Sequence, residues 1–151
     1  MNAIISLEPI TKENLDEVLA LRVAEGQERF VSSTAESLAQ AYVYEETAYP
    51  FAVYADSELV GFIMMGYYEV KGYYTLWKFM IDRRYQNYGY GRKALELGLL
   101  FIKDNFHVEV IYTGVTPGNI VAKRLYESVG FKETGLVECN MEEMRLELRK
   151  V

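Results

Sequence analysis

The sequence predicts an α/β domain built on a mixed, mainly antiparallel sheet that is flanked by helices. Runs rich in β-forming residues at 51–55, 58–68 and 73–81 follow one another with joins of hairpin length, so these strands pair antiparallel. A strand, a helix and another strand then span 73–115, and such a unit places its two strands parallel. With 151 residues the chain can bury a sizeable core, and we expect one domain over 1–151.

Local signals bound each expected element. Thr11 is the expected N-cap of the first helix and Thr34 that of the second, while Pro117-Gly118-Asn119 opens the last helix and Gly130 ends it. The predicted order is β-α-α-β-β-β-α-β-α-β-β. Its elements are a strand at 3–8, helices at 12–22 and from 34 to about 44, strands at 51–55, 58–68 and 73–81, a helix ending near 105, a strand at 109–115, a helix ending at 130, and a closing hairpin of strands at 131–137 and 141–148.

Charge and composition exclude several classes of function. The net charge of −6, from 16 basic and 22 acidic residues, disfavours a nucleic-acid partner. No apolar run reaches the ~20 residues of a membrane span, and the N-terminus does not look like a signal peptide. The single cysteine, Cys139, fits the reducing cytoplasm, where we expect the protein. With one histidine, His107, a His/Cys metal cluster cannot be assembled, so no metal is expected.

The stretch YQNYGYGRK at 85–93 has the features of an anion-binding turn. Gly89 and Gly91 can take backbone conformations barred to other residues and allow close approach of a ligand to the main chain. The free N–H groups at the start of the next helix, together with Arg92 and Lys93, favour a phosphate there. A strand-to-helix turn that merely needs glycine would have the same sequence, so the glycines alone leave both interpretations open.

A nicotinamide-binding site is an alternative prediction for this turn, because residues 89–94 also match the dinucleotide fingerprint G-x-G-x-x-A. That fingerprint directly follows the first strand of a parallel unit and requires an acidic residue ~20 positions later. Here the preceding strand ends some residues before the turn and is itself preceded by three others, and the positions around 112–114 carry no carboxylate. The context therefore argues against a nicotinamide enzyme.

Two motifs together indicate a family. Residues 86–91 match Q-x-x-G-x-G at the start of a helix, and residues 119–131 match N-x-x-A-x-x-L-Y-x-x-x-G-F after the next strand. In this order, with these strands around them, they resemble the GNAT family of acetyl-CoA-dependent N-acetyltransferases over nearly the whole chain. The resemblance implies a GNAT-like fold, acetyl-CoA as cosubstrate, and the pyrophosphate of coenzyme A as the anion held by the turn.

The resemblance also implies roles for individual residues. The backbone of 79–81 would pair with the pantetheine arm, and an amide there can polarise the thioester carbonyl. Asn119 would contact the pantetheine and Tyr126 would be the catalytic general acid; they are seven apart and so share a helix face. Asn119 can equally be an N-cap, and Tyr126 a packed aromatic. The expected cofactor-binding residues are Phe79, Met80, Ile81, Gln86, Asn87, Tyr88, Gly89, Tyr90, Gly91, Arg92, Asn119 and Tyr126.

The substrate prediction is a small cationic amine. The segment 76–91, with Gly61-Phe62, is similar to bacterial spermine/spermidine acetyltransferases, and the acidic balance of the chain suits a polycation. The expected substrate-binding residues are Glu28, Phe30, Glu69 and Trp77, since carboxylates and aromatic faces attract ammonium groups. Some animal polyamine acetyltransferases carry a glutamate at the position of Trp77 that helps deprotonate the amine. The base therefore stays open, with a water chain to Glu28 or Glu69 as the suggestion.

Other functions remain possible on the sequence. Aminoglycosides, amino acids or protein N-termini are alternative acceptors, and a non-catalytic acetyl-CoA-binding domain is the alternative outside the enzymes. His107 is expected at the far end of its helix, away from the pyrophosphate, and Cys139 in the closing hairpin, so neither is expected to react. Direct attack of the amine on the thioester is the expected mechanism, and the resemblance suggests a homodimer.

Overall fold

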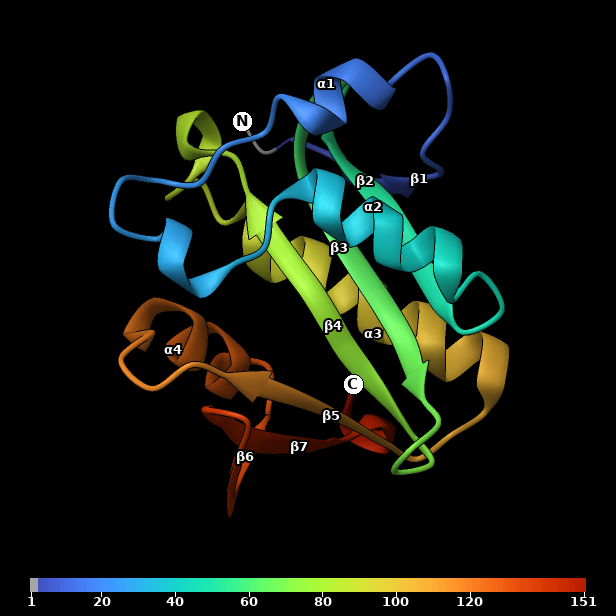
Figure 1. Cartoon of the computed structure of the whole chain (residues 1–151), viewed down its shortest axis with the longest axis vertical. Coiled ribbons are helices and arrows are strands. Elements are labelled where there is room, and N and C mark those ends of the chain that lie inside the picture. The colour runs from blue at the N-terminus through green and yellow to red at the C-terminus, as the bar shows by residue number, and fades with distance from the viewer. Residues whose placement is uncertain (1–2) are drawn as a thin grey trace.

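The computed structural model describes residues 3–151 and contains one seven-stranded sheet with the strand order β1-β2-β3-β4-β5-β7-β6 (Figure 1). Among the described strands, β4 and β5 pair in parallel and all other neighbours pair antiparallel. The predicted fold class and element order are confirmed. The elements are β1 (Ile5–Glu8), α1 (Leu15–Leu19), α2 (Thr34–Val43), β2 (Ala48–Ala55), β3 (Glu58–Tyr68), β4 (Tyr73–Ile81), α3 (Tyr90–Phe106), β5 (Val110–Val115), α4 (Ile120–Ser128), β6 (Lys132–Glu138) and β7 (Met141–Glu147), with short 3-10 helices at Glu28–Phe30, Arg83–Tyr85 and Leu148–Lys150.

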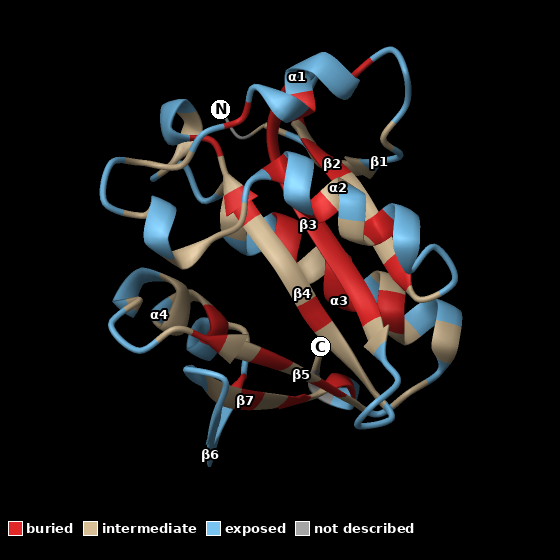
Figure 2. Cartoon of the chain, viewed as in Figure 1, coloured by how far each residue is buried: buried red, intermediate tan, exposed pale blue. Residues whose placement is uncertain are grey.

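Helices cover both faces of the sheet, α3 on one face and α1 with α2 on the other (Figure 1). The two faces of the sheet carry separate hydrophobic cores. Alternate residues of β3 pack in one core or the other, because successive side chains of a strand point to opposite faces. Ile63 and Met65 pack in the core under α3, and Phe62 and Met64 in the core under α1 and α2. β3 is therefore buried along most of its length (Figure 2). Within residues 3–151, no helix combines the length and apolar composition that crossing a bilayer requires.

The first helix is shorter than predicted, and Thr11 is not its cap. The helix begins after Asn14, whose side chain accepts a hydrogen bond from the Thr11 amide and donates to the Pro9 carbonyl. It ends at Leu19, and the Arg22 amide instead donates to the Asp82 carboxylate at 3.0 Å. The helix thus ends earlier than its sequence pattern predicts, and the Arg22 amide bonds to a residue 60 positions away instead of continuing the helix.

Two boundaries near α2 and β2 also differ from the prediction. Ser33, not Thr34, caps α2, with its hydroxyl accepting from the Glu36 amide, while the Thr34 hydroxyl donates to the Val18 carbonyl. β2 begins at Ala48, so Pro50 lies inside the strand rather than before it. Proline is tolerated there because β1 pairs with β2 only from Ala52 onward, which leaves one side of Pro50 without a partner strand.

Candidate active site

The parallel strands β4 and β5 separate part-way along their length. They pair only over Tyr74–Leu76 and Ile111–Thr113, whereas β3 stays paired with β4 as far as Ile81. Beyond Leu76 the two strands diverge (Figure 1), and a cavity of about 710 Å³ is lined by both of them. The β5-facing backbone of 77–81 therefore has no partner strand on that side. Phe79, Met80 and Ile81, which the resemblance predicts to bind the acetyl donor, all line this cavity, so we call it the donor cavity.

A β-bulge in β4 adjoins this opening. Met64 pairs with Lys78 and Met65 with Leu76, which leaves Trp77 as the extra residue. As a result, the side chains of Trp77 and Lys78 both lie on the face of the sheet that α1 and α2 cover, which we call the α2 face. The Trp77 ring contacts Tyr44 edge-on at 5.8 Å between centroids, and Lys78 Nζ donates to Ser32 Oγ at 2.7 Å.

The glycine turn lines the donor cavity, and its two glycines differ in backbone conformation. Asn87 and Gly89 have φ of +70° and +81°, which puts both in the left-handed region. Gly91 lies in α3 without a positive φ, and a Cβ there would make ordinary contacts at 3.6 Å with Ile81 and Leu125. The expectation that both glycines need unusual angles is therefore wrong for Gly91. The turn residues lining the cavity are Gln86, Asn87, Gly89, Tyr90, Gly91 and Arg92.

Tyr88 is the one expected turn residue that does not line this cavity. It is largely exposed, and its ring stacks on Tyr90 at 5.4 Å between centroids. Its side chain therefore lies on the outer surface of the turn.

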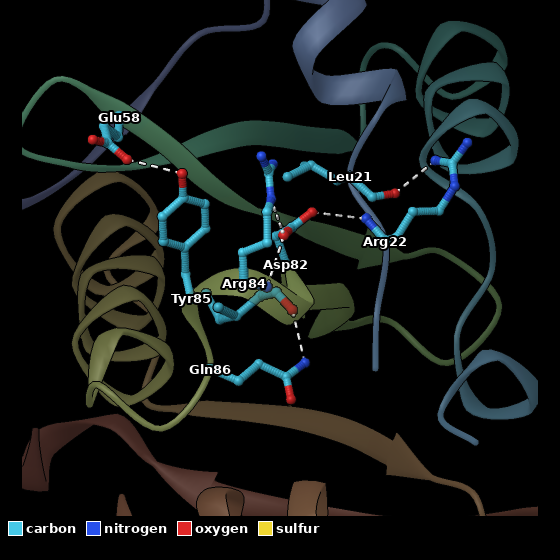
Figure 3. A network of polar contacts seen from close by, with 8 residues as sticks. Leu21, Arg22, Glu58, Asp82, Arg84, Tyr85 and Gln86 are labelled. Carbon is cyan, nitrogen blue, oxygen red and sulfur yellow. Dashed lines mark hydrogen bonds and ion pairs between the residues drawn. The ribbon is translucent and has the colours of Figure 1, made fainter. Parts of the chain in front are cut away.

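A buried carboxylate anchors the turn to the end of β4 (Figure 3). Asp82 is 2% exposed and accepts hydrogen bonds from the amides of Arg22 and Arg84 and from Arg84 Nε. Burial alone would raise the pKa of Asp82, but the hydrogen bonds from Arg84 and Arg22 outweigh it and hold that pKa below its ordinary value. Asp82 thus stays ionised and ties the segment after α1 to the turn.

Gln86 has a positioning role within the same network (Figure 3). Its Nε2 donates to the Ile81 carbonyl at 2.9 Å. The same Nε2 also donates to Gln27 Oε1 at 3.0 Å. These bonds join the turn both to the end of β4 and to the loop before the 3-10 helix at Glu28–Phe30. The side chain that the sequence motif singled out therefore shapes the turn as well as lining the cavity.

Asn119 and Tyr126 both line the donor cavity from α4. Asn119 is the N-cap of this helix, since its Oδ1 accepts from the Ala122 amide at 3.3 Å. Tyr126 is 8% exposed, and its ring lies 5.8 Å from that of Phe131. Burial raises the pKa of Tyr126 to about 12, so the phenol keeps its proton at neutral pH. Among residues 3–151 its hydroxyl has no hydrogen-bond partner, which leaves the proton available to a ligand.

Comparisons with known proteins agree with this geometry. The model of the acetyltransferase (GNAT) family matches residues 15–131. The spermine/spermidine N(1)-acetyltransferase of Bacillus subtilis (strain 168) is 31% identical over 148 residues, which cover 93% of this chain and 95% of that protein. The chain belongs to the acetyltransferase (GNAT) family. It is thus an N-acetyltransferase of the family that uses acetyl-CoA as cosubstrate, as the two motifs predicted.

Solved structures confirm the GNAT fold. A spermidine N-acetyltransferase from Vibrio cholerae in complex with CoA and spermine superposes with a TM-score of 0.77 at 19% identity, covering 97% of this chain and 96% of that one. An aminoglycoside acetyltransferase in complex with coenzyme A gives a TM-score of 0.79 at 15% identity with the same coverage. Acetyltransferases named for different acceptors fit the chain equally well, so the GNAT fold by itself does not select the amine.

A second cavity of about 610 Å³ adjoins the donor cavity, and we call it the acceptor cavity because it is the candidate site for the amine. The two cavities share Trp77, Thr113, Gly114 and Met141. Their charges differ in sign. Arg29, Lys78, Arg92 and Glu36 line the donor cavity, for a net charge of +2, and Glu69, Glu138, Glu143 and Lys71 line the acceptor cavity, for a net charge of −2.

The structure separates the residues expected to bind substrate. Phe30 lines the donor cavity, Glu69 lines the acceptor cavity, and Trp77 lines both. Glu28 lines neither cavity; its carboxylate accepts a hydrogen bond from the Gly26 amide at 2.8 Å. His107 follows the far end of α3, and Cys139 lies exposed in the turn between β6 and β7, as expected.

Several side chains at the site carried no signal in the sequence. Lys78 is on the α2 face because of the bulge, which the even run of β-forming residues in β4 does not reveal. Glu143 and Tyr73 are 70 residues apart, yet the Tyr73 hydroxyl donates to Glu143 Oε2 at 3.3 Å, and Lys71 lies 3.6 Å from the same carboxylate. Only strand pairing brings these groups to one cavity.

Proposed function

We propose that this protein acetylates a primary amine of a polyamine, spermine or spermidine, by direct attack on acetyl-CoA in a ternary complex. The observation that carries the proposal is the contact between two cavities of opposite charge. Phosphates of the donor suit the cationic cavity, and a polycation suits the anionic one. The shared wall at Trp77, Thr113, Gly114 and Met141 is where thioester and amine would meet.

The proposed donor site uses the backbone more than side chains. The amides of 87–92, at the turn and the start of α3, would hold the pyrophosphate, with Arg92 adding charge. The unpaired edge of β4 at 79–81 would accept the pantetheine as a further strand would, and an amide there would polarise the thioester carbonyl. The turn fits this role because the space beside Gly89 is open: no atom lies within 4 Å of where its Cβ would be.

We assign the general-acid role to Tyr126. Its hydroxyl can protonate the departing sulfur, because burial keeps it protonated and its proton is not committed to another residue of 3–151. Asn119, on the same helix, would contact the pantetheine through the part of its amide that capping leaves free. Of the two carboxylates suggested for amine deprotonation, Glu69 lies at the acceptor cavity, so the proposed water chain leads to Glu69 rather than to Glu28.

The aromatic and acidic residues that line the acceptor cavity also favour a polyamine as the substrate. Tyr44, Tyr67, Tyr68, Tyr73 and Trp77 line it together with the three carboxylates, and aromatic faces attract ammonium groups and pack on alkyl linkers. The relative from Bacillus subtilis, named for spermine and spermidine, is similar over nearly its whole length. Aminoglycosides are the second candidate, because they too are polycations and the aminoglycoside enzyme has the same fold.

A competition assay tests the acceptor. With acetyl-CoA and a mixture of polyamines, aminoglycosides and amino acids, we expect the highest kcat/KM for spermine or spermidine, measured by product mass. Glu69→Gln should raise the KM for spermine by roughly two- to fivefold, as for other exposed charges, whereas Glu13→Gln, also exposed but away from both cavities, should not. High salt should raise the same KM by screening. Equal or lower kcat/KM for polyamines would refute the substrate and leave the acetyltransferase standing.

We also propose a homodimer that uses the β6 side of the sheet. β6 is exposed along its whole length and presents Leu136 and Val137. A break in the β6–β7 register near Gly135 makes backbone pairing with a second copy unfavourable, so side chains would form the contact. Light scattering should give the mass of two chains, and Val137→Lys should give that of one. A single-chain mass for the unchanged protein would contradict the dimer.

Charge and cysteine content bear on location and on other partners. The net charge of −6 disfavours nucleic acid, and we propose none as a partner. The free, exposed thiol of Cys139 is suited to a reducing compartment, which supports the cytoplasm as the proposed location.

A further inference from the structure

Lys78 is an amine that the chain itself places in the donor cavity. We propose that Lys78 accepts an acetyl group from the acetyl-CoA bound to the same chain, which makes it a site of self-acetylation. This inference rests on the donor placement proposed above.

The bulge decides where this side chain lies. In a regular strand the side chains of Trp77 and Lys78 would point to opposite faces of the sheet. The extra residue of the bulge places both on the α2 face. Lys78 directly precedes the backbone of 79–81, where the thioester carbonyl would lie, and its side chain lines the same cavity. Ser32, Thr34 and Glu36, at the start of α2 and just before it, line the same cavity.

The surroundings of the Lys78 amine favour its neutral, nucleophilic form. Its Nζ donates to the hydroxyl of Ser32 at 2.7 Å, and among residues 3–151 it makes no ion pair with a carboxylate. Burial lowers the pKa of Lys78, and the more distant Glu36 opposes this only in part. A larger fraction of Lys78 is therefore unprotonated at a given pH than of a lysine in water. A neutral hydroxyl partner also leaves the amine free to turn toward a bound ligand.

The step balances without any further reagent. The nitrogen lone pair of Lys78 attacks the thioester carbonyl carbon, a C–N amide bond forms, and the C–S bond breaks with its electron pair leaving on sulfur. The nitrogen loses one proton and the sulfur gains one, through Tyr126 and solvent. The products are Nζ-acetyl-lysine and the free thiol of coenzyme A.

Peptide mass spectrometry after incubation with acetyl-CoA, with no amine added, tests the proposal. We expect Lys78 to be acetylated at least about tenfold faster than Lys12 and Lys132, because bound reactants gain from proximity. Both control lysines are exposed and line neither cavity. Lys78→Arg keeps the positive charge but cannot be acetylated, so the whole-chain mass should lose one acetyl group. Unfolding the chain should remove the preference for Lys78.

The outcomes separate this inference from the proposed function. Equal rates at Lys78, Lys12 and Lys132 would overturn it, because random acetylation in solution would then explain the modification. An unmodified Lys78 in a chain that acetylates spermine would also overturn it and would leave the proposed function intact. Failure to acetylate both Lys78 and every amine tested would overturn both.

Discussion

Tyr126→Phe is expected to lower kcat by about 10²-fold or more while leaving the affinity for acetyl-CoA unchanged. The change keeps the ring that packs against Phe131 and removes only the proton donor. A general acid acts on the departing sulfur in the transition state, so its loss reduces turnover rather than ground-state binding. Steady-state kinetics with spermine and calorimetry with acetyl-CoA measure the two quantities separately.

The pH dependence provides an independent check of the Tyr126 assignment. Burial raises the pKa of Tyr126 from the ordinary tyrosine value of 10.0 to about 12, so the acid form is lost only as the pH rises toward the higher value. The rate should therefore rise with pH as the amine deprotonates and should not fall on passing about pH 10. Tyr42→Phe, at a largely exposed tyrosine on α2, is the matched control and should change neither kcat nor this profile. Full turnover in Tyr126→Phe, with chemistry rate-limiting, would make this tyrosine a packing residue only.

Gly89→Val is expected to weaken acetyl-CoA binding by about tenfold or more. The φ of +81° at Gly89 lies in a region that costs a residue with a Cβ about 1–2 kcal/mol, and a β-branched residue more. Because no atom lies within 4 Å of the added Cβ, the cost is conformational, and the turn can relieve it by relaxing. Binding acetyl-CoA would then require the turn to return to its strained conformation, which costs the same conformational energy. A cost of 1.4 kcal/mol corresponds to roughly a factor of ten in affinity. Isothermal titration calorimetry measures the loss.

Gly135→Val separates backbone strain from binding. Gly135 has φ of +90° and open space around its Cβ position, but it lies in β6, outside the donor cavity. We expect it to lower the thermal midpoint much as Gly89→Val does, without changing the affinity for acetyl-CoA. Gly91→Val probes the space beside the helix start, because Gly91 has no positive φ. Unchanged affinity in a folded Gly89→Val protein would contradict the assignment of the turn to the pyrophosphate.

Local sequence signals determined the order of the elements and two of the segments that line the donor cavity. The glycine turn and the Asn119–Tyr126 helix could be predicted because each depends on residues close together in the chain. A left-handed turn needs glycine or asparagine at particular positions, and a seven-residue spacing places two side chains on one helix face whatever surrounds the helix. The acetyltransferase family followed from these two short motifs.

Tertiary structure decided what lies between and opposite those motifs. The separation of β4 from β5, the bulge at Trp77 and the early end of α1 at Leu19 arise from strand pairing and from the Asp82 network, whose partners lie up to 60 residues apart. Glu28 and Glu69 carried the same signal in the sequence, yet only Glu69 reaches a cavity. A side chain's position relative to a distant strand depends on register, and a single extra residue such as Trp77 changes which face the next side chain occupies. For that reason no sequence motif marks Lys78, and only the folded structure shows that it lines the donor cavity.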